Sequence, residues 1–112
     1  MKPAVPDFSL VLACYNEASI FEKSVEEIIT TLCNCTHSFE IIFVDDKSCD
    51  ATPHLIDNIC KKYQFCRALY NTKNYGRGRT IVEGIRASHG GVVGFIDIDI
   101  EISPSSASGE SK

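Results

Sequence analysis

Three acidic residues at every second position end the last apolar segment of the sequence. Asp97, Asp99 and Glu101 lie within GFIDIDIE, residues 94–101. Because residues two apart in an extended segment point to the same side, these carboxylates are expected to converge. A hard divalent cation such as Mg²⁺ or Mn²⁺ relieves the resulting repulsion by accepting oxygen ligands. The alternative is a solvated acidic loop, since acids at this spacing also occur on exposed strands.

A second acidic cluster begins with Asp45 and Asp46, at the end of the apolar segment 39–46. A carboxylate at the carboxyl end of a strand can accept hydrogen bonds from a base N–H or a ribose hydroxyl, as in dinucleotide-binding folds. Asp50 and Thr52, which follow, are residue types that cap helices. Capping by either one leaves Asp45 and Asp46 for a ligand.

A basic, glycine-rich turn, NYGRGR at residues 74–79, is the third cluster. Its glycines let backbone approach a ligand, and the neighbouring Arg77 and Arg79 suit a diphosphate. A solvated basic turn is the alternative, because a G-x-G alone falls short of a dinucleotide-binding fingerprint. Together, the three clusters predict a nucleoside diphosphate bound through a divalent ion.

The elements that must position these residues alternate along the chain. Apolar segments predict strands, apolar residues at three- and four-residue spacing predict helices, and the alternation predicts a Rossmann-like α/β fold, a parallel sheet with helices on both faces. Because crossovers are right-handed, all the strands end at one edge, where such sheets bind ligands. The expected strands are 8–15, 39–46, 66–71 and 92–97, and the expected helices are 19–35, a segment starting at Pro53, and 80–88.

One helix start has a recognisable pattern. Ser19 and Glu22 have the spacing of a capping box at the start of the first helix. Such a pair would satisfy the free amide groups there.

Composition limits the class of protein. The 112 residues, with 44% apolar content and a formal net charge of −4, predict one small globular domain. No apolar run is long enough for a membrane span and the N-terminus lacks a signal-peptide core, so a soluble, cytoplasmic chain is expected. The six cysteines lack C-x-x-C spacing and are expected to be free, small buried residues.

Four segments in order carry a family resemblance. LVLACYNEAS, EIIFVDDKSCDAT, NYGRGRTIVEGI and VVGFIDIDIEISP resemble the motifs of the inverting GT-A fold glycosyltransferases of family 2. The similarity covers residues 8–104 and is greatest to dolichol-phosphate mannosyltransferases and other polyprenyl-phosphate sugar transferases. It implies inverting transfer of a sugar from a GDP-mannose or UDP-glucose type donor to a polyprenyl phosphate, assisted by Mg²⁺ or Mn²⁺.

The resemblance also implies roles for individual residues. Asp97 and Asp99 would form a catalytic D-x-D metal site, with Glu101 as a third ligand where relatives often have glutamine. Ala13 replaces a proline that is common in the first motif. The nucleotide sugar would be bound by Ala13, Tyr15, Glu17, Val44, Asp45, Asp46, Asn74, Arg77, Asp97 and Asp99.

The resemblance also sets expectations for the whole chain. Residues 1–104 are expected to form the nucleotide-sugar-binding part of a GT-A domain, followed by a disordered tail at 105–112. The acceptor half and its membrane contacts would then lie outside this chain, at the cytoplasmic face of a membrane. An open sheet edge predicts a homo-oligomer, and no nucleic-acid partner is predicted.

Other functions remain open at this point. A fragment that binds a nucleotide sugar without transferring it is the first alternative. A phosphatase of the haloacid-dehalogenase type also uses D-x-D, but normally on its first strand, and a phosphorelay receiver domain needs a separate phosphoacceptor aspartate and a lysine on later strands.

Overall fold

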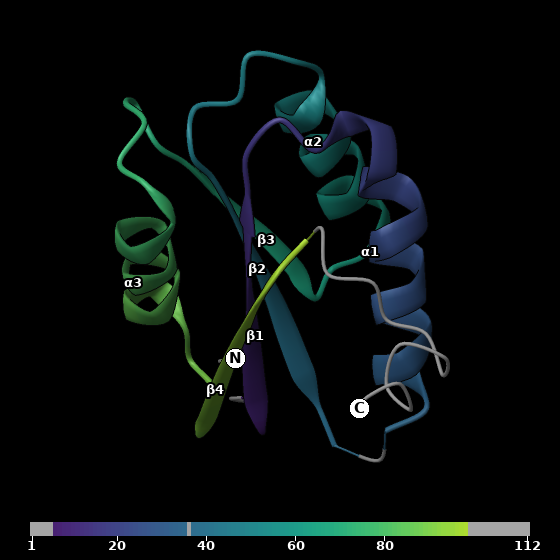
Figure 1. The fold of residues 1–112 in the computed structure, drawn as a ribbon. Helices are drawn as coiled ribbons and strands as arrows, with labels where there is room; N and C mark the ends of the chain where they lie inside the picture. The colour runs from purple at the N-terminus through teal and green to yellow at the C-terminus, as the bar shows by residue number, and fades with distance from the viewer. Residues whose placement is uncertain (1–5, 36, 99–112) are drawn as a thin grey trace, which may run out of the picture.

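The computed structural model describes residues 6–35 and 37–98. In these residues the chain forms a four-stranded parallel sheet in the order β3-β2-β1-β4, with α1 and α2 on one face and α3 on the other (Figure 1). The predicted α/β architecture is therefore confirmed. The strands are β1 (Phe8–Cys14), β2 (Phe39–Asp45), β3 (Cys66–Tyr70) and β4 (Val92–Asp97), and the helices are α1 (Ala18–Cys33), α2 (Thr52–Lys62) and α3 (Arg77–Ala87).

The strand register brings the predicted site segments to one edge. Cys14 at the end of β1 pairs with Asp45 of β2, and Ala13 pairs with Asp97 of β4. Asp45 and Asp97 therefore lie at the same, carboxyl edge of the sheet, as predicted. The loops that enter all three helices leave the sheet at this edge (Figure 1).

The two faces of the sheet carry cores of different size. The larger core lies under α1 and α2 and includes Leu12, Phe43, Phe21 and Ile56, and the rings of Phe21 and Phe43 lie 5.6 Å apart. Burial of large apolar side chains such as these stabilises the fold. The smaller core, under α3, is formed by the strand residues Val11, Ile42 and Val44 with partly buried neighbours.

The predicted capping box at the start of α1 is wrong. The helix begins at Ala18, one residue before Ser19, and no side chain from its own first turn caps it. Instead, the N–H of Glu17 donates to Thr52 Oγ1 at 2.9 Å, and the N–H of Ala18 donates to Asp50 Oδ2 at 3.2 Å. Acceptors at the start of α2 and just before it thus satisfy amides at the start of α1. Asp50 also accepts the N–H of Thr52 at 2.9 Å, but the N-cap position of α2 is Ala51, which makes no side-chain cap.

Helix α3 begins three residues earlier than predicted. Gly76 has a φ of +92° and ends the turn, a conformation that glycine adopts without steric cost. The helix therefore starts at Arg77, and Gly78 lies inside its first turn. The glycine-rich turn, predicted at residues 74–79, therefore ends at Gly76.

The C-terminal end of α3 is fixed to the opposite edge of the sheet by Glu40. This buried carboxylate accepts hydrogen bonds from the N–H of His89 (2.6 Å), the hydroxyl of Ser9 (2.5 Å) and the guanidinium of Arg67 (2.9 Å). Ser9 Oγ in turn accepts the N–H of Gly90 at 2.8 Å. Burial by itself would raise the pKa of Glu40, but the bonds from Ser9, His89 and Arg67 outweigh it and lower the pKa.

Other predictions concern the chain as a whole. No helix among the described residues has the length and apolar character needed to cross a membrane. The predicted domain limit at 104 and the tail 105–112 lie outside those residues. Cys14 and Cys66 are buried as expected, but that expectation is wrong for three exposed cysteines, Cys33, Cys35 and Cys49.

Candidate functional site

A cleft of about 270 Å³ lies between the end of β1 and the start of α3. Its walls come from three segments that are distant in sequence: the end of β1 with its following loop, the loop after β2, and the turn that enters α3. Its volume is close to the lower end of the roughly 300–1,000 Å³ typical of ligand pockets. The residues that line it are Ala13, Cys14, Tyr15, Glu17, Asp46, Asn74, Gly76, Arg77 and Thr80.

The loop after β1 is held by the loop after β2. Asn16 has a left-handed φ of 55°, which asparagine tolerates better than most residues. Its N–H donates to Ser48 Oγ at 2.8 Å, and its Oδ1 accepts the N–H of Cys49 at 2.7 Å. These bonds fix the segment that carries Tyr15, whose side chain is 45% exposed at the cleft.

Asp45 belongs to the same junction. Its carboxylate is buried and accepts both the N–H of Ser48 (3.0 Å) and the Ser48 hydroxyl (2.6 Å). Because Ser48 Oγ also accepts the N–H of Asn16, Asp45 supports the loop after β1 through one intermediate side chain. Asp45 lies beside the cleft but does not line it.

Asp46 is engaged with the opposite wall of the cleft. Its Oδ1 accepts the N–H of Tyr75 (2.8 Å) and the side-chain amide of Asn71 (2.9 Å), and its Oδ2 accepts the N–H of Gly76 (2.8 Å). The side chain of Asn74 also donates to the Asp46 carbonyl at 3.1 Å. Burial by itself would raise the pKa of Asp46, but the bonds from Tyr75, Asn71, Gly76 and Thr80 outweigh it and lower the pKa.

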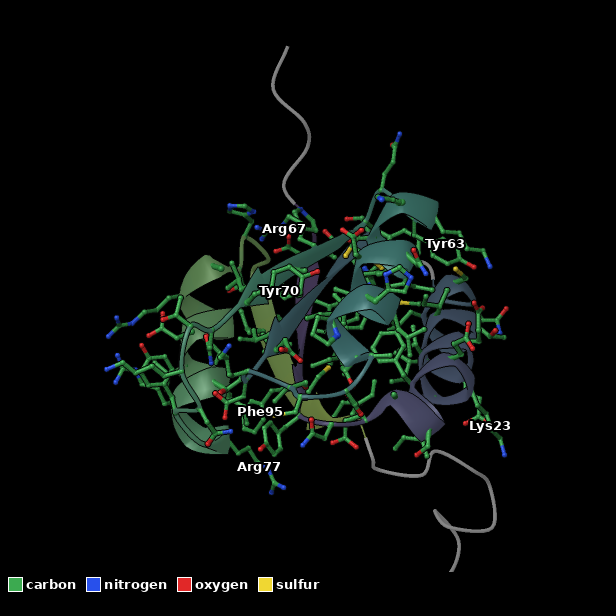
Figure 2. The ribbon with its side chains drawn as sticks, turned by 90° about the horizontal axis from the view of Figure 1, so that it is seen from above. Lys23, Tyr63, Arg67, Tyr70, Arg77 and Phe95 are labelled. Atoms are coloured by element: carbon green, nitrogen blue, oxygen red, sulfur yellow. The ribbon has the colours of Figure 1, made fainter. Side chains whose placement is uncertain are left out.

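The start of α3 gives this wall a positive character. The first amides of a helix have no partners within the helix, and they carry the positive end of its dipole. Arg77, the first residue of α3, lines the cleft beside Gly76 and Thr80. A helix start combined with an arginine suits a phosphate or diphosphate group. Arg77 extends from the β4 side of α3 (Figure 2).

The second arginine of the basic turn has other contacts. The guanidinium of Arg79 lies 4.7 Å from the ring centre of Tyr75 and pairs with Glu83 at 3.3 Å. Arg79 does not line the cleft. Of the two arginines in the predicted turn, only Arg77 therefore lies at the candidate site.

The predicted metal site can be located only by its first residue. Asp97 ends β4 and pairs with Ala13, a residue of the cleft wall, so the backbone brings position 97 to the edge of the cleft. Asp99 and Glu101 lie outside the described residues.

The structure brings together most of the predicted nucleotide-sugar residues. Val44 is an exception, because its side chain is fully buried in the core beneath α3. Sequence reasoning missed Cys14 and Thr80. Thr80 is a fully buried polar residue on α3. Its place next to the basic turn was the only sequence feature that could have pointed to it. The predicted residues that line the cleft are Ala13, Tyr15, Glu17, Asp46, Asn74 and Arg77.

Proteins of similar sequence and structure are glycosyltransferases. The family model described as Glycosyl transferase family 2 matches residues 9–108. Undecaprenyl-phosphate 4-deoxy-4-formamido-L-arabinose transferase of Pseudomonas fluorescens (strain Pf0-1) is 29% identical over 98 residues, which are 86% of this chain and 28% of that protein. The chain spans only 15–31% of the length of the curated relatives it matches.

Two solved structures share the fold. Mannosyltransferase PcManGT from Pyrobaculum calidifontis, in complex with GDP-Man and Mn²⁺, has a TM-score of 0.72 and 21% identity over 86% of this chain and 28% of its own. S. aureus TarS 1-349, in complex with UDP, has a TM-score of 0.66 and 26% identity over 83% of this chain and 27% of its own. The predicted GT-A fold is therefore confirmed.

Proposed function

Because the chain belongs to glycosyl transferase family 2, we propose that its cleft binds a nucleoside-diphosphate sugar with a divalent cation for transfer to a polyprenyl phosphate. A GDP-mannose or UDP-glucose type donor fits this proposal, since one structural neighbour holds GDP-Man and another holds UDP. Because the chain belongs to this glycosyltransferase family, we do not pursue the phosphatase and phosphorelay receiver alternatives.

The observation that carries the proposal is the pairing of two chemically different walls across one cleft. Tyr15 and Glu17 offer an aromatic ring and a carboxylate on one side, while Arg77 and the start of α3 offer positive charge on the other. An aromatic ring and a carboxylate suit a nucleoside, and the positive wall suits its diphosphate. With a volume of about 270 Å³, the cleft is too small to enclose a whole nucleotide sugar, so part of the donor would extend beyond it.

Carboxylates at positions 97, 99 and 101 would hold the cation. Carboxylate oxygens are the ligands that Mg²⁺ and Mn²⁺ prefer, and the backbone of Asp97 runs beside the cleft wall at Ala13. No group of three potential ligands is placed to hold a metal among residues 6–35 and 37–98, and the proposed site includes Asp99 and Glu101, which lie outside those residues. When bound, the cation would stabilise the charge that develops on the leaving diphosphate.

The acceptor determines what else the reaction needs. A polyprenyl phosphate is anionic near neutral pH, so it can attack the anomeric carbon without a general base. A single displacement of this kind inverts the configuration of that carbon. The name of the P. fluorescens relative supports an acceptor of this class, and a lipid acceptor places the reaction at a membrane surface, which we propose is the cytoplasmic face.

Calorimetry tests the nucleotide and metal parts of the proposal together. GDP and UDP are titrated into the chain with and without Mn²⁺, and the titrations are repeated on Asp99→Ala. Because each ligand should tighten the other, Mn²⁺ is expected to raise nucleotide affinity roughly 5- to 150-fold, the usual range of such coupling. Asp99→Ala should abolish that increase.

The matched control is Asp57→Ala, which removes an exposed carboxylate on α2 that pairs with Lys61; it should retain the effect of Mn²⁺. Equal nucleotide affinity under all conditions would contradict the metal site. A separate incubation with GDP-mannose or UDP-glucose and a polyprenyl phosphate distinguishes transfer from binding alone. Tight binding without product would favour the non-catalytic alternative.

A further inference from the structure

We propose that Asp46 is a positioning residue that holds the start of α3 in the orientation needed to bind the diphosphate. This inference rests on the proposed nucleotide site. It differs from the role implied by family resemblance, in which Asp46 contacts the nucleotide itself. The difference arises from the hydrogen bonds that the carboxylate makes within the protein.

Both oxygens of Asp46 are already occupied by the segment that leads into α3. Tyr75 and Gly76 donate consecutive backbone N–H groups to Oδ1 and Oδ2, each at 2.8 Å. Asn71 adds its side-chain amide to Oδ1 at 2.9 Å. The side chain is only 4% exposed, so a ligand in the cleft meets little of the carboxylate. Charge-assisted bonds of this kind are about twice as strong as neutral ones.

The bonded segment ends where the positive wall begins. Gly76 immediately precedes Arg77, and its positive φ of 92° sets the direction in which α3 leaves the turn. Thr80, one turn into the helix, accepts the side-chain amide of Asn71 at 3.2 Å, and the same amide donates to Asp46. One carboxylate therefore fixes both the turn and the first turn of the helix that carries Arg77.

The neighbouring aspartate acts on the other wall. Asp45 bonds to Ser48, and Ser48 accepts the N–H of Asn16 in the loop that carries Tyr15. Adjacent residues at the end of β2 thus support opposite walls of the cleft. Loss of the Asp46 carboxylate should accordingly weaken binding of the diphosphate and leave binding of the nucleoside unchanged.

The test compares a nucleoside diphosphate with its own nucleoside. Asp46→Asn keeps the size of the side chain but replaces one acceptor oxygen with an amide group that cannot accept from an N–H. GDP and guanosine, or UDP and uridine if UDP binds the wild type more tightly, are titrated by NMR, which also detects weak binding. We expect the affinity for the diphosphate to fall roughly 10- to 100-fold, which corresponds to the free energy of hydrogen bonds to a charged group. The affinity for the nucleoside should not change.

Two further measurements separate positioning from general loss of structure. Hydrogen exchange at the amides of Tyr75 and Gly76, measured without ligand, should accelerate in Asp46→Asn while core amides of β1 stay protected. The control Asp57→Asn removes the same charge from the exposed face of α2 and should change neither exchange nor binding.

The remaining outcomes overturn the proposal in distinguishable ways. An equal loss for diphosphate and nucleoside would mean that Asp46 supports the whole cleft or touches the nucleoside. Unchanged diphosphate affinity would mean that the hydrogen bonds of Asp46 to the turn before α3 do not affect binding. If wild type binds no nucleotide, the proposed function itself fails, and the role of Asp46 in it fails as well.

Discussion

Glu40 and Asp46 are buried carboxylates at the two ends of the strip of β2 that faces α3. Each is nearly inaccessible to solvent, and each accepts backbone N–H groups from a segment that flanks the helix. Burial alone would disfavour the charged form of both side chains. Their hydrogen-bond donors reverse that effect, so both pKa values are lowered.

A lowered pKa makes the contribution of Glu40 to stability dependent on pH. The folded-state pKa lies below the unfolded-state value, so the contribution is fully present above the ordinary glutamate pKa of about 4.3 and is lost as pH falls through the folded-state pKa. Glu40→Gln should therefore lower the free energy of unfolding by about 1–3 kcal/mol at pH 7. The deficit should shrink below pH 4. Urea unfolding of wild type and Glu40→Gln at pH 7 and pH 3 measures the difference in the free energy of unfolding.

The control for this prediction is Glu26→Gln, which removes an exposed charge that pairs with Lys62. Exposed pairs contribute about 0–1 kcal/mol, so this variant should remain close to wild type. A Glu40→Gln deficit of the same size at pH 7 and pH 3 would refute the assignment.

At the residue scale, sequence reasoning located the acidic and basic clusters but not the bonds between them. Asp45 and Asp46 stand out because they follow an apolar segment, and Arg77 stands out because it lies in a basic, glycine-rich turn. Glu40, inside an apolar segment, gave no such signal. Its partners Ser9 and His89 are 31 and 49 residues away, and no local pattern reports contacts over that separation.

At the element scale, α3 packs closely on the sheet at Gly84. A Cβ added at Gly84 would lie 3.0 Å from Val44 Cγ2 and closer still to Val11 Cγ1. The absence of a side chain at this position therefore allows α3 to rest directly on β1 and β2. Any larger residue must push the helix outward or displace the valines.

Gly84→Ala tests this close packing. Overpacking of a core typically costs about 1–3 kcal/mol, while alanine gains about 1 kcal/mol over glycine in a helix. The net result should be a loss of about 0–2 kcal/mol in the free energy of unfolding, measured by chemical denaturation.

Gly78→Ala is the internal control, because an added Cβ there meets nothing within 4 Å. This variant should be neutral or more stable than wild type, by up to about 1 kcal/mol. Equal effects of the two substitutions would show that helix propensity alone, and not contact with the sheet, determines the outcome.

Strands and helices were predictable where periodic apolar residues decide the structure. The boundaries of β4 agree with prediction, and those of β1, β2 and β3 differ by one residue. The start of α1 was predicted within one residue but with the wrong capping contacts, and the start of α3 was missed by three residues, both for a physical reason. Their amides bond to acceptors in other segments, at Thr52 for α1 and at Asp46 for α3, and the sequence around each helix start does not contain those acceptors.

At the scale of the whole molecule, β4 forms an open edge. Among the described residues it pairs only with β1, and its Val92 and Phe95 side chains are 68% and 55% exposed. Figure 2 shows Phe95 near this edge, away from Tyr70 of β3 at the other. Unpaired strand edges with exposed apolar side chains favour association with another chain.

We therefore expect the chain to form dimers or larger species through β4. Phe95→Lys should weaken that association, because a lysine on an edge strand opposes edge-to-edge pairing. A rise in the dissociation constant of roughly tenfold or more, equivalent to about 1.4 kcal/mol, is expected from sedimentation velocity over a range of concentrations. Val82→Lys, on the exposed surface of α3, is the control. A monomer at every concentration would contradict the prediction.

The two carboxylates of β2 also restrict the length of the segment between them. From Glu40 to Asp46 the strand makes six steps, or about 20 Å at 3.3 Å per residue, and the 11 residues of α3 extend about 16 Å. One inserted residue within α3 would turn everything after it by about 100° and move it by about 1.5 Å. Gly84 would then leave the sheet, or one anchored end would detach. The number of residues from Gly76 to His89 is therefore constrained as well as the identity of its glycines, and this segment is a poor place for an insertion or deletion.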